Sequence, residues 1–333
     1  MSLKKLMKPV WKAGFQEKNA ALPDGTLLHY AEGPENGNQP LLLIHGQTGA
    51  WQDYASVLPK LCQSYHVFVL DCHGHGKSSK GPEKYSAMAM CKDFAWFLSE
   101  VAGGPAVVSG HSSGGLLAAY LAANDPALVS GVVLEDPPFF STEWGERWEK
   151  SFAYVDTYAP MHAFLNQSEE TDWILYYLKH ASWAAFLGDK KMGRLISYGE
   201  RYRRKHPGKP LNYWFLPDSV NHMFWFIDDY DLRFGESFYN GSWFREFDQE
   251  KTLRRILCPA VLLHTRWSVD ENDILMAAMS GNDAQRASRL IPNCELISID
   301  SSHDAHFEKP QEFLDAFTWL KRLKPMDYNG RDA

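Results

Sequence analysis

The feature that most limits how this chain can fold is a glycine-flanked serine between an apolar run and a small-residue helix. Residues 110–114 read Gly-His-Ser-Ser-Gly; a short apolar run precedes them, and the run from Leu116 to Ala123 follows. A serine on so sharp a strand-to-helix turn is strained, so the residues two before and two after it must lack side chains. Gly110 and Gly114 meet this requirement. The pattern predicts that Ser112 is a nucleophile at the start of a helix whose N-terminus favours negative charge.

Short apolar runs, spaced by enough chain for a helix, predict a parallel β-sheet around this serine. They are Leu41 to Ile44, His66 to Leu70, Ala106 to Val108 and Val132 to Leu134. Because each is apolar over consecutive residues, they are typical of strands buried on both faces of a sheet. A hairpin is predicted before them, with strands from Phe15 to Leu22 and from Thr26 to Tyr30.

The alternation of strands and helices stops after residue 136 and later resumes. Its second part comprises a strand from Ala260 to Leu263, a helix from Ile274 to Leu290, a strand from Glu295 to Ile299 and a helix from Pro310 to Leu323. The interruption holds seven of the 12 tryptophans and mostly helical periodicity. We interpret it as a helical cap over the C-terminal edge of the sheet, where open α/β sheets bind ligands. The predicted domains are a core of residues 1–136 and 251–333 and a cap of residues 137–250.

Composition excludes several classes of function. The formal charge is −7 and the short basic cluster Arg201 to Lys205 is typical of a solvated helix face, so no nucleic-acid partner is expected. Five scattered cysteines without a CxxC pair argue against disulfides and a zinc site. No apolar stretch has the length of a signal peptide or a bilayer span. We therefore expect a soluble, cytoplasmic protein with a small-molecule substrate and no membrane partner; the oligomeric state is not indicated.

A second glycine-containing loop follows the strand from Leu41 to Ile44. Residues 45–49 read His-Gly-Gln-Thr-Gly. Acyl transfer produces an oxyanion, and each backbone N–H that binds it contributes about 3 kcal/mol. A loop of this kind supplies one donor and the residue after the nucleophile supplies the other. The predicted oxyanion hole consists of the amides of Gln47 and Ser113.

A histidine must activate the serine, because a hydroxyl is a poor nucleophile at neutral pH. Residues 301–310, between the last strand and the last helix, contain His303 and His306. His303 comes first after the strand and is the predicted general base. His306 lies nearer the helix that begins at Pro310, where packing or capping is the ordinary role.

Taken together, these parts resemble the α/β-hydrolase family over nearly the whole chain. The resemblance rests on the hairpin, the His-Gly loop, the stretch from Asp71 to Ser78, the serine turn, the inserted cap and a terminal histidine followed by Glu-Lys-Pro. It implies a mostly parallel eight-stranded sheet with a helical cap. In similar proteins the loop that holds Asp71, His73 and His75 is structural, so neither a metal nor a cofactor is expected.

The family's third catalytic residue, a carboxylate, is where this sequence departs from the pattern. Relatives most often carry it about four residues past the strand from Ala260 to Leu263, near Ser268 here, and Asp270 lies two residues later. Some relatives, including haloalkane dehalogenases, carry it after the preceding strand, where Asp136 stands. Asp270 is the preferred candidate and Asp136 the alternative. Glu135, Glu271 and Asp273 are weaker candidates.

These parts predict a serine hydrolase that acts through an acyl-enzyme on a carboxylic ester with an apolar or aromatic acyl group. Because Ser112 stands where dehalogenases and epoxide hydrolases of similar fold use aspartate, those chemistries are disfavoured. Hydrolysis of amides, peptides or carbon–carbon bonds stays open. So does a different class of function, a small-molecule receptor with slow turnover.

Overall fold

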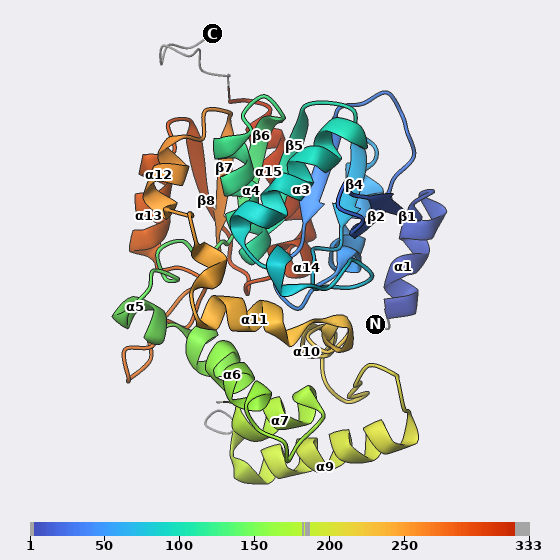
Figure 1. Ribbon diagram of the computed structural model, residues 1–333, viewed down its shortest axis with the longest axis vertical. Coiled ribbons are helices and arrows are strands. Elements are labelled where there is room, and N and C mark those ends of the chain that lie inside the picture. Colours follow the sequence, from blue (N-terminus) through green and yellow to red (C-terminus); the bar gives the residue numbers. More distant parts are fainter. Residues whose placement is uncertain (1–2, 182, 184–186, 324–333) are drawn as a thin grey trace.

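The computed structural model describes residues 3–181, 183 and 187–323 and centres on one twisted sheet (Figure 1). Its strands lie in the order β1-β2-β4-β3-β5-β6-β7-β8. They are β1 (Gln16–Ala21), β2 (Leu27–Glu32), β3 (Pro40–Ile44), β4 (His66–Leu70), β5 (Ala106–His111), β6 (Val129–Glu135), β7 (Ala260–His264) and β8 (Cys294–Ser298). The β1–β2 and β2–β4 pairs are antiparallel and the other pairs are parallel. The prediction of a mostly parallel eight-stranded sheet is confirmed.

Alternate residues of the central strands enter two separate cores. Leu42 and Ile44 of β3 pack on one face with α3 (Ala87–Glu100), α4 (Ser113–Asn124) and α13 (Gly281–Leu290). Leu41 and Leu43 pack on the other face with α1 (Leu3–Lys12), α2 (Leu58–Leu61) and α15 (Pro310–Leu320). Successive side chains of a strand point to opposite faces, which is why runs of consecutive apolar residues mark strands covered by helices on both sides.

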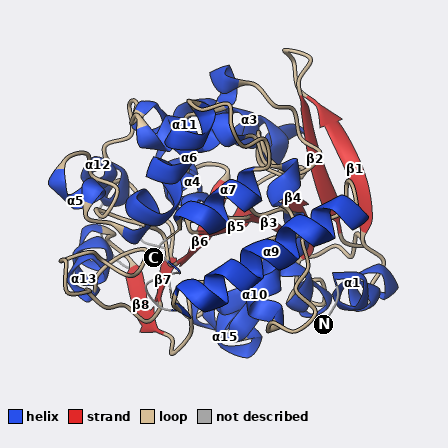
Figure 2. Cartoon of the chain, turned by 90° about the horizontal axis from the view of Figure 1, so that it is seen from below, coloured by secondary structure: helices blue, strands red, loops and turns tan. Residues whose placement is uncertain are grey.

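Between β6 and β7 the chain leaves the sheet and forms a series of mostly short helices. They are α5 (Glu146–Glu149), the π-helix η3 (Ala153–Tyr158), α6 (Ala159–Leu165), α7 (Trp173–His180), α9 (Asp189–Lys205), α10 (Asp218–His222), η4 (Ile227–Asp229), α11 (Leu232–Tyr239), η5 (Ser242–Phe244) and α12 (Gln249–Arg254). In Figure 1, α6, α7 and α9 lie below the sheet, and Figure 2 shows α7, α9 and α10 in front of the central strands. Because α12 packs on α4 and α13, the predicted cap boundary at residue 250 falls inside a helix of the core.

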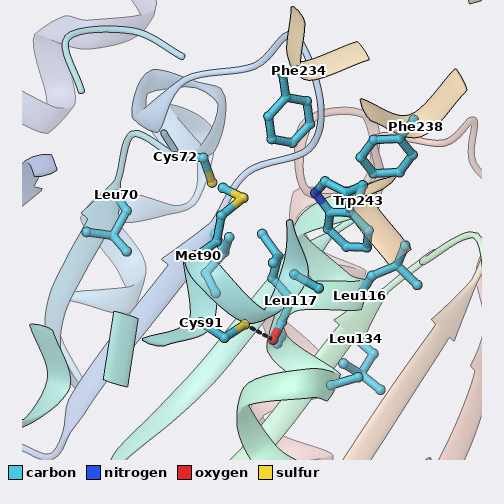
Figure 3. Close-up of a cluster of buried hydrophobic side chains, with 14 of the residues drawn as sticks. Leu70, Cys72, Met90, Cys91, Leu116, Leu117, Leu134, Phe234, Phe238 and Trp243 are labelled. Atoms are coloured by element: carbon cyan, nitrogen blue, oxygen red, sulfur yellow. Dashed lines mark hydrogen bonds between the residues drawn. The ribbon is translucent and has the colours of Figure 1, made fainter. Parts of the chain in front are cut away.

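Aromatic side chains attach this inserted segment to α4. Trp243 lies beside Leu116 in a buried cluster that also holds Leu117 and the α11 residues Phe234 and Phe238 (Figure 3). The Phe238 and Trp243 rings are 4.5 Å apart, and both side chains are almost fully buried. Burial of large aromatic side chains dominates the energetics of such contacts. The inserted segment is therefore packed firmly onto the helix that follows the predicted nucleophile.

The helix predicted from Ile274 to Leu290 begins later, at Gly281. Ser280 caps it, since its hydroxyl accepts a hydrogen bond from the Asp283 amide, and Asp283 bonds back to Ser280. Leu275, which lies before this helix, instead makes backbone hydrogen bonds with Lys150 and Phe152. Tertiary pairing has overridden a locally helical pattern.

Two further features bear on the predicted class of protein. No helix within residues 3–181 and 187–323 combines the length and apolarity needed to cross a bilayer. All five cysteines carry free thiols. Burial raises the pKa of the Cys72 and Cys91 thiols well above the ordinary value, so these two are poor nucleophiles at neutral pH.

Candidate active site

Ser112 occupies a strained turn between β5 and α4. Its φ is 53° and its ψ −121°, a conformation that L-residues rarely adopt and that costs about 1–3 kcal/mol. A Cβ on Gly110 would lie 2.1 Å from the Gly114 carbonyl oxygen, and one on Gly114 would lie 2.3 Å from the Ile44 carbonyl oxygen. Glycine is therefore required on both sides of the serine. The Ser112 amide donates to the Glu135 carbonyl oxygen at 2.9 Å, which anchors the turn to β6.

His303 lies in the loop between β8 and the short helix α14 (Ala305–Glu308). Its Nδ1 is 2.8 Å from Oδ2 of Asp136. With the Nδ1–H donating to this carboxylate, Nε2 carries the lone pair that can accept a proton. Burial opposes the charged imidazolium, but the hydrogen bond and the negative charge of Asp136 outweigh it and raise the pKa of His303 above 6.5.

Asp136 directly follows β6 and is almost completely buried, with 1% of its side chain exposed. Oδ1 accepts from the Thr265 amide at 3.2 Å, and Oδ2 accepts from the Thr265 hydroxyl at 2.6 Å. Burial favours the neutral acid, yet hydrogen bonds from His264, His303 and Thr265 outweigh it and lower the pKa of Asp136. This carboxylate is therefore held ionised and oriented toward His303.

The preference for Asp270 is corrected by this geometry. Oδ1 of Asp270 accepts hydrogen bonds from the amides of Asn272 and Ile274 at 2.9 and 2.8 Å, the pattern of an aspartate that closes its own turn. Among the described residues it makes no hydrogen bond to His303. Asp136, the alternative, takes its place as the proposed acid.

The predicted oxyanion loop is held by the inserted segment. The Gln47 side chain is hydrogen bonded at both ends, accepting from the Tyr158 hydroxyl and donating to the Tyr230 hydroxyl. Thr48 has a φ of 63°, and its amide donates to Nε2 of His75 at 3.2 Å. Within the described part of the chain, neither the Gln47 amide nor the Ser113 amide has a protein acceptor. Both donors are thus available to a bound group.

The loop that begins with Asp71 is structural. The two carboxylate oxygens of Asp71 accept from the Trp51 amide at 2.9 Å and the Lys77 amide at 3.0 Å, and Nδ1 of His29 lies 2.7 Å away. Burial lowers the pKa of His75 well below 6.5, which keeps its Nε2 available as the acceptor for Thr48. No group of metal-ligating side chains is found among the described residues.

A cavity of about 550 Å³ opens at the carboxyl ends of the parallel strands. Gly46, Ser112, Asp136, Thr265 and His303, which follow β3, β5, β6, β7 and β8, all line it. The apolar part of its wall comes mainly from the inserted segment and includes Phe152, Tyr158, Met161, Trp173, Tyr177, Phe224, Phe226, Phe238 and Met276. A larger surface groove of about 930 Å³ near Trp144 and Arg254 contains none of the predicted site residues.

The cations that line this cavity are already paired. Nε2 of His222 lies 2.9 Å from Oδ1 of Asp53, the distance of an ion pair. Arg266 donates to the Ser301 carbonyl at 3.0 Å and lies 3.4 Å from Glu308. Among the described lining residues there is no free cation to meet a negatively charged ligand.

Sequence reasoning missed contacts that join distant parts of the chain. The tyrosines that hold Gln47 carry no local signal, because aromatic residues in a helical insertion usually form its own core. The sequence makes Glu135 a weaker candidate for the acid and predicts a packing or capping role for His306, whereas the two side chains bond to each other. The signal available in the sequence was that Glu135 directly precedes Asp136 and that His306 follows His303 by three residues.

Solved structures of similar fold cover almost the whole chain. A hydrolase from Pseudomonas aeruginosa PA01 aligns over 93% of this chain and 99% of its own, with a TM-score of 0.63 and 20% identity. The enol-lactonase from Burkholderia xenovorans LB400 aligns over 92% of this chain and 100% of its own, with a TM-score of 0.61 and 17% identity. At this identity the likeness concerns the fold alone.

Curated relatives match more locally. Bifunctional epoxide hydrolase 2 of Sus scrofa is 34% identical over 119 residues, 34% of this chain and 21% of its own. The 2-(acetamidomethylene)succinate hydrolase of Mesorhizobium japonicum is 33% identical over 111 residues, 33% of this chain and 40% of its own. The matched part is thus well under half of either relative. The family model described as alpha/beta hydrolase fold matches residues 39–310, and by this match the chain belongs to the α/β-hydrolase fold family.

Proposed function

We propose that this protein is a serine hydrolase that cleaves carboxylic esters with an apolar or aromatic, uncharged acyl group. The observation that carries the proposal is the pairing of His303 with Asp136 at 2.8 Å in the same cavity as the strained Ser112. The family supports a hydrolase, and the serine in the turn supports acyl transfer.

In the proposed reaction Nε2 of His303 takes the proton of the Ser112 hydroxyl as Oγ bonds to the acyl carbon. The carbonyl electron pair becomes an oxyanion, which the Gln47 and Ser113 amides stabilise. The oxyanion collapses, the carbon–oxygen bond to the leaving group breaks, and His303 donates its proton to the departing alcohol. Water then attacks the acyl-enzyme with His303 as base, which releases the acid and restores the serine hydroxyl.

The cavity wall supports the proposed substrate class. Its aromatic and methionine side chains favour apolar surface, because an acyl chain buried there gains about 25 cal/mol per Å² removed from water. A carboxylate on the acyl group would find His222 and Arg266 already paired with acids. Its desolvation would not be repaid, so uncharged acyl groups are favoured.

Active-site labelling and an ester panel test the proposal. A fluorophosphonate probe is expected to label Ser112, and Ser112→Ala is expected to abolish both labelling and turnover of p-nitrophenyl esters. Ser99→Ala, which removes an exposed serine of α3 that does not line the cavity, serves as the matched control and should label normally. Labelling that survives Ser112→Ala would refute the nucleophile.

The acyl panel separates the remaining functions. Butyrate, hexanoate and phenylacetate esters should be turned over better than a hemisuccinate ester. Faster cleavage of aminoacyl amides or vinylogous diketones would move the assignment to amide or carbon–carbon bond hydrolysis. Stoichiometric labelling with less than one turnover per minute on every substrate would favour a receptor.

A further inference from the structure

Two consecutive acids at the end of β6 hold two histidines of a single loop. Asp136 bonds to His303, and Glu135, one residue earlier, bonds to His306, three residues later. The end of one strand therefore supplies an acid partner for each histidine of the loop. The proposed mechanism uses only one of these pairs.

The Glu135–His306 pair is the more buried of the two. Nδ1 of His306 lies 2.9 Å from both carboxylate oxygens of Glu135, and the His306 amide donates to Oε1 at 2.7 Å. The side chains are 0% and 1% exposed. The same residue, Glu135, receives the Ser112 amide on its carbonyl oxygen. One residue of β6 therefore ties the nucleophile turn and the histidine loop to the same point of the sheet.

His111 links this pair to His303. Burial lowers the pKa of His111 to about 4, so the ring is neutral at physiological pH. Its Nε2 lies 3.1 Å from the His303 carbonyl oxygen and can donate to it. The His111 ring packs 4.5 Å from the His303 ring and 5.1 Å from the His306 ring. His111, which does not enter the proposed chemistry, therefore contacts both the backbone and the side chain of His303.

We infer that Glu135 and His306 are positioning residues that set the location of His303 relative to Ser112. The inference rests on the proposed function, because it concerns the histidine that serves there as the general base. A buried acid–histidine pair is weak as a source of stability, since an apolar pair of similar volume is often as stable or more so. What an apolar pair lacks is a fixed hydrogen-bonding geometry. A misplacement of about 1 Å at a reacting group can cost about 100-fold in rate.

The decisive variant replaces the pair by apolar residues. Glu135→Leu combined with His306→Leu removes the hydrogen bonds without leaving an unpaired charge. We expect kcat per fluorophosphonate-titrated site to fall about 10- to 100-fold, with KM changed less than about threefold. The melting temperature should fall somewhat, because the His306 backbone amide loses its acceptor, and kcat per titrated site separates this loss from an effect on the reaction. A merely structural pair would change the melting temperature and leave kcat per titrated site intact.

A conservative variant checks that the hydrogen bond is responsible. The side-chain amide nitrogen of asparagine occupies the position of the histidine Nδ1, so His306→Asn keeps a donor to Glu135 and is expected to retain kcat within about threefold. Asp93→Asn is the matched control. It alters another buried acid–histidine pair, His73–Asp93 at 2.9 Å, which does not line the cavity, and should leave kcat per site unchanged.

The outcomes separate this inference from the proposed function. Unchanged kcat per titrated site in the double leucine variant, with the wild type active and labelled at Ser112, would overturn the inference alone. A wild type that neither labels at Ser112 nor cleaves esters would overturn the proposed function and the inference with it. If the double leucine variant does not fold, Glu135→Gln combined with His306→Phe decides: phenylalanine removes the ring donor at similar shape, and glutamine keeps an acceptor for the backbone amide of residue 306 without leaving a charge. A kcat per titrated site equal to that of the wild type would refute the pair's role.

Discussion

Nδ1 of His303 lies 2.8 Å from Oδ2 of Asp136, although 167 positions separate the two residues in the sequence. The neighbouring strand supports the same carboxylate through the amide and hydroxyl of Thr265. Three segments that are far apart in the chain therefore meet at one buried acid, and the expected behaviour of the site follows from that acid.

Replacing the acid tests the proposed triad. Asp136→Asn should lower kcat by up to about 10⁴-fold, because the amide no longer fixes the productive tautomer of His303 or stabilises its imidazolium. Asp270→Asn should stay within about tenfold of the wild type, since this residue closes its own turn. Both variants are compared by ester turnover on protein shown to be folded by circular dichroism. The reverse ranking would restore Asp270 as the acid.

The pH dependence of kcat/KM reports the same pair. His303 must be neutral to accept the serine proton, so activity rises as pH increases through its pKa. Asp136 raises that pKa, so the half-maximal point should lie above 6.5. Removing the carboxylate in Asp136→Asn should move the residual activity's half-maximal point to lower pH. A profile that is unchanged, or that moves to higher pH, would contradict the pairing.

The stability of the fold should decline in alkaline solution because of His306. Glu135 overcomes the effect of burial and raises the pKa of His306 to about 9, against 6.5 when unfolded. The negative charges of Asp304 and Asp53 also raise the pKa of His306. Relative to the neutral histidine, a raised pKa contributes stability that is complete below pH 6.5 and disappears as pH rises through about 9. This gain from protonation is distinct from the net worth of the pair against an apolar replacement.

Urea unfolding at pH 6.5 and pH 9.5 measures this contribution. The free energy of unfolding of the wild type should fall between the two, and His306→Asn should flatten the difference. An equal fall in wild type and variant would assign the alkaline loss to other groups.

The backbone strain at Ser112 predicts which of two substitutions gives the more stable protein. Ser112→Gly should be about 1 kcal/mol more stable than Ser112→Ala, because only glycine adopts a φ of 53° without penalty. At Ser197, an exposed position in the interior of α9, the same pair of substitutions should give the opposite order, since glycine destabilises a helix relative to alanine. The melting temperatures of the four variants test this prediction. If glycine and alanine ranked in the same order at both positions, the result would argue against a strained turn at Ser112.

Single hydroxyl deletions test whether the hydrogen bonds from the cap to Gln47 fix the position of the predicted oxyanion loop. Tyr158→Phe and Tyr230→Phe each free one end of the Gln47 side chain. Each should lower kcat, by less than the 10²- to 10³-fold expected for loss of an oxyanion donor itself. Tyr213→Phe removes a buried hydroxyl that bonds only within the cap, to the Leu195 carbonyl, and should affect melting but not kcat. Equal kcat in all three variants would show that the loop keeps its position without the cap.

The sequence by itself determined the parts whose signals are local. Runs such as Leu41 to Ile44 identify doubly covered strands, because consecutive apolar residues are needed to fill both faces of a sheet. The turn at Ser112 is equally local, since close backbone contacts around it require glycine at Gly110 and Gly114. The proposal of Ser112 as nucleophile and His303 as base therefore rests on local signals alone.

Only the tertiary structure decided which acid bonds to His303 and that Glu135 bonds to His306 of the same loop. Asp136 and Asp270 follow adjacent parallel strands, and both strands end at the same edge of the sheet, so position in the chain cannot rank them. The ranking comes from the backbone beyond each strand: Asp136, at a φ of 43°, turns into the site, whereas the chain after Thr265 closes a separate turn at Asp270. The contacts of Glu135 with His306 and of Gln47 with Tyr158 and Tyr230 are likewise long-range, and hydrogen bonds between distant segments leave no periodic trace in a sequence.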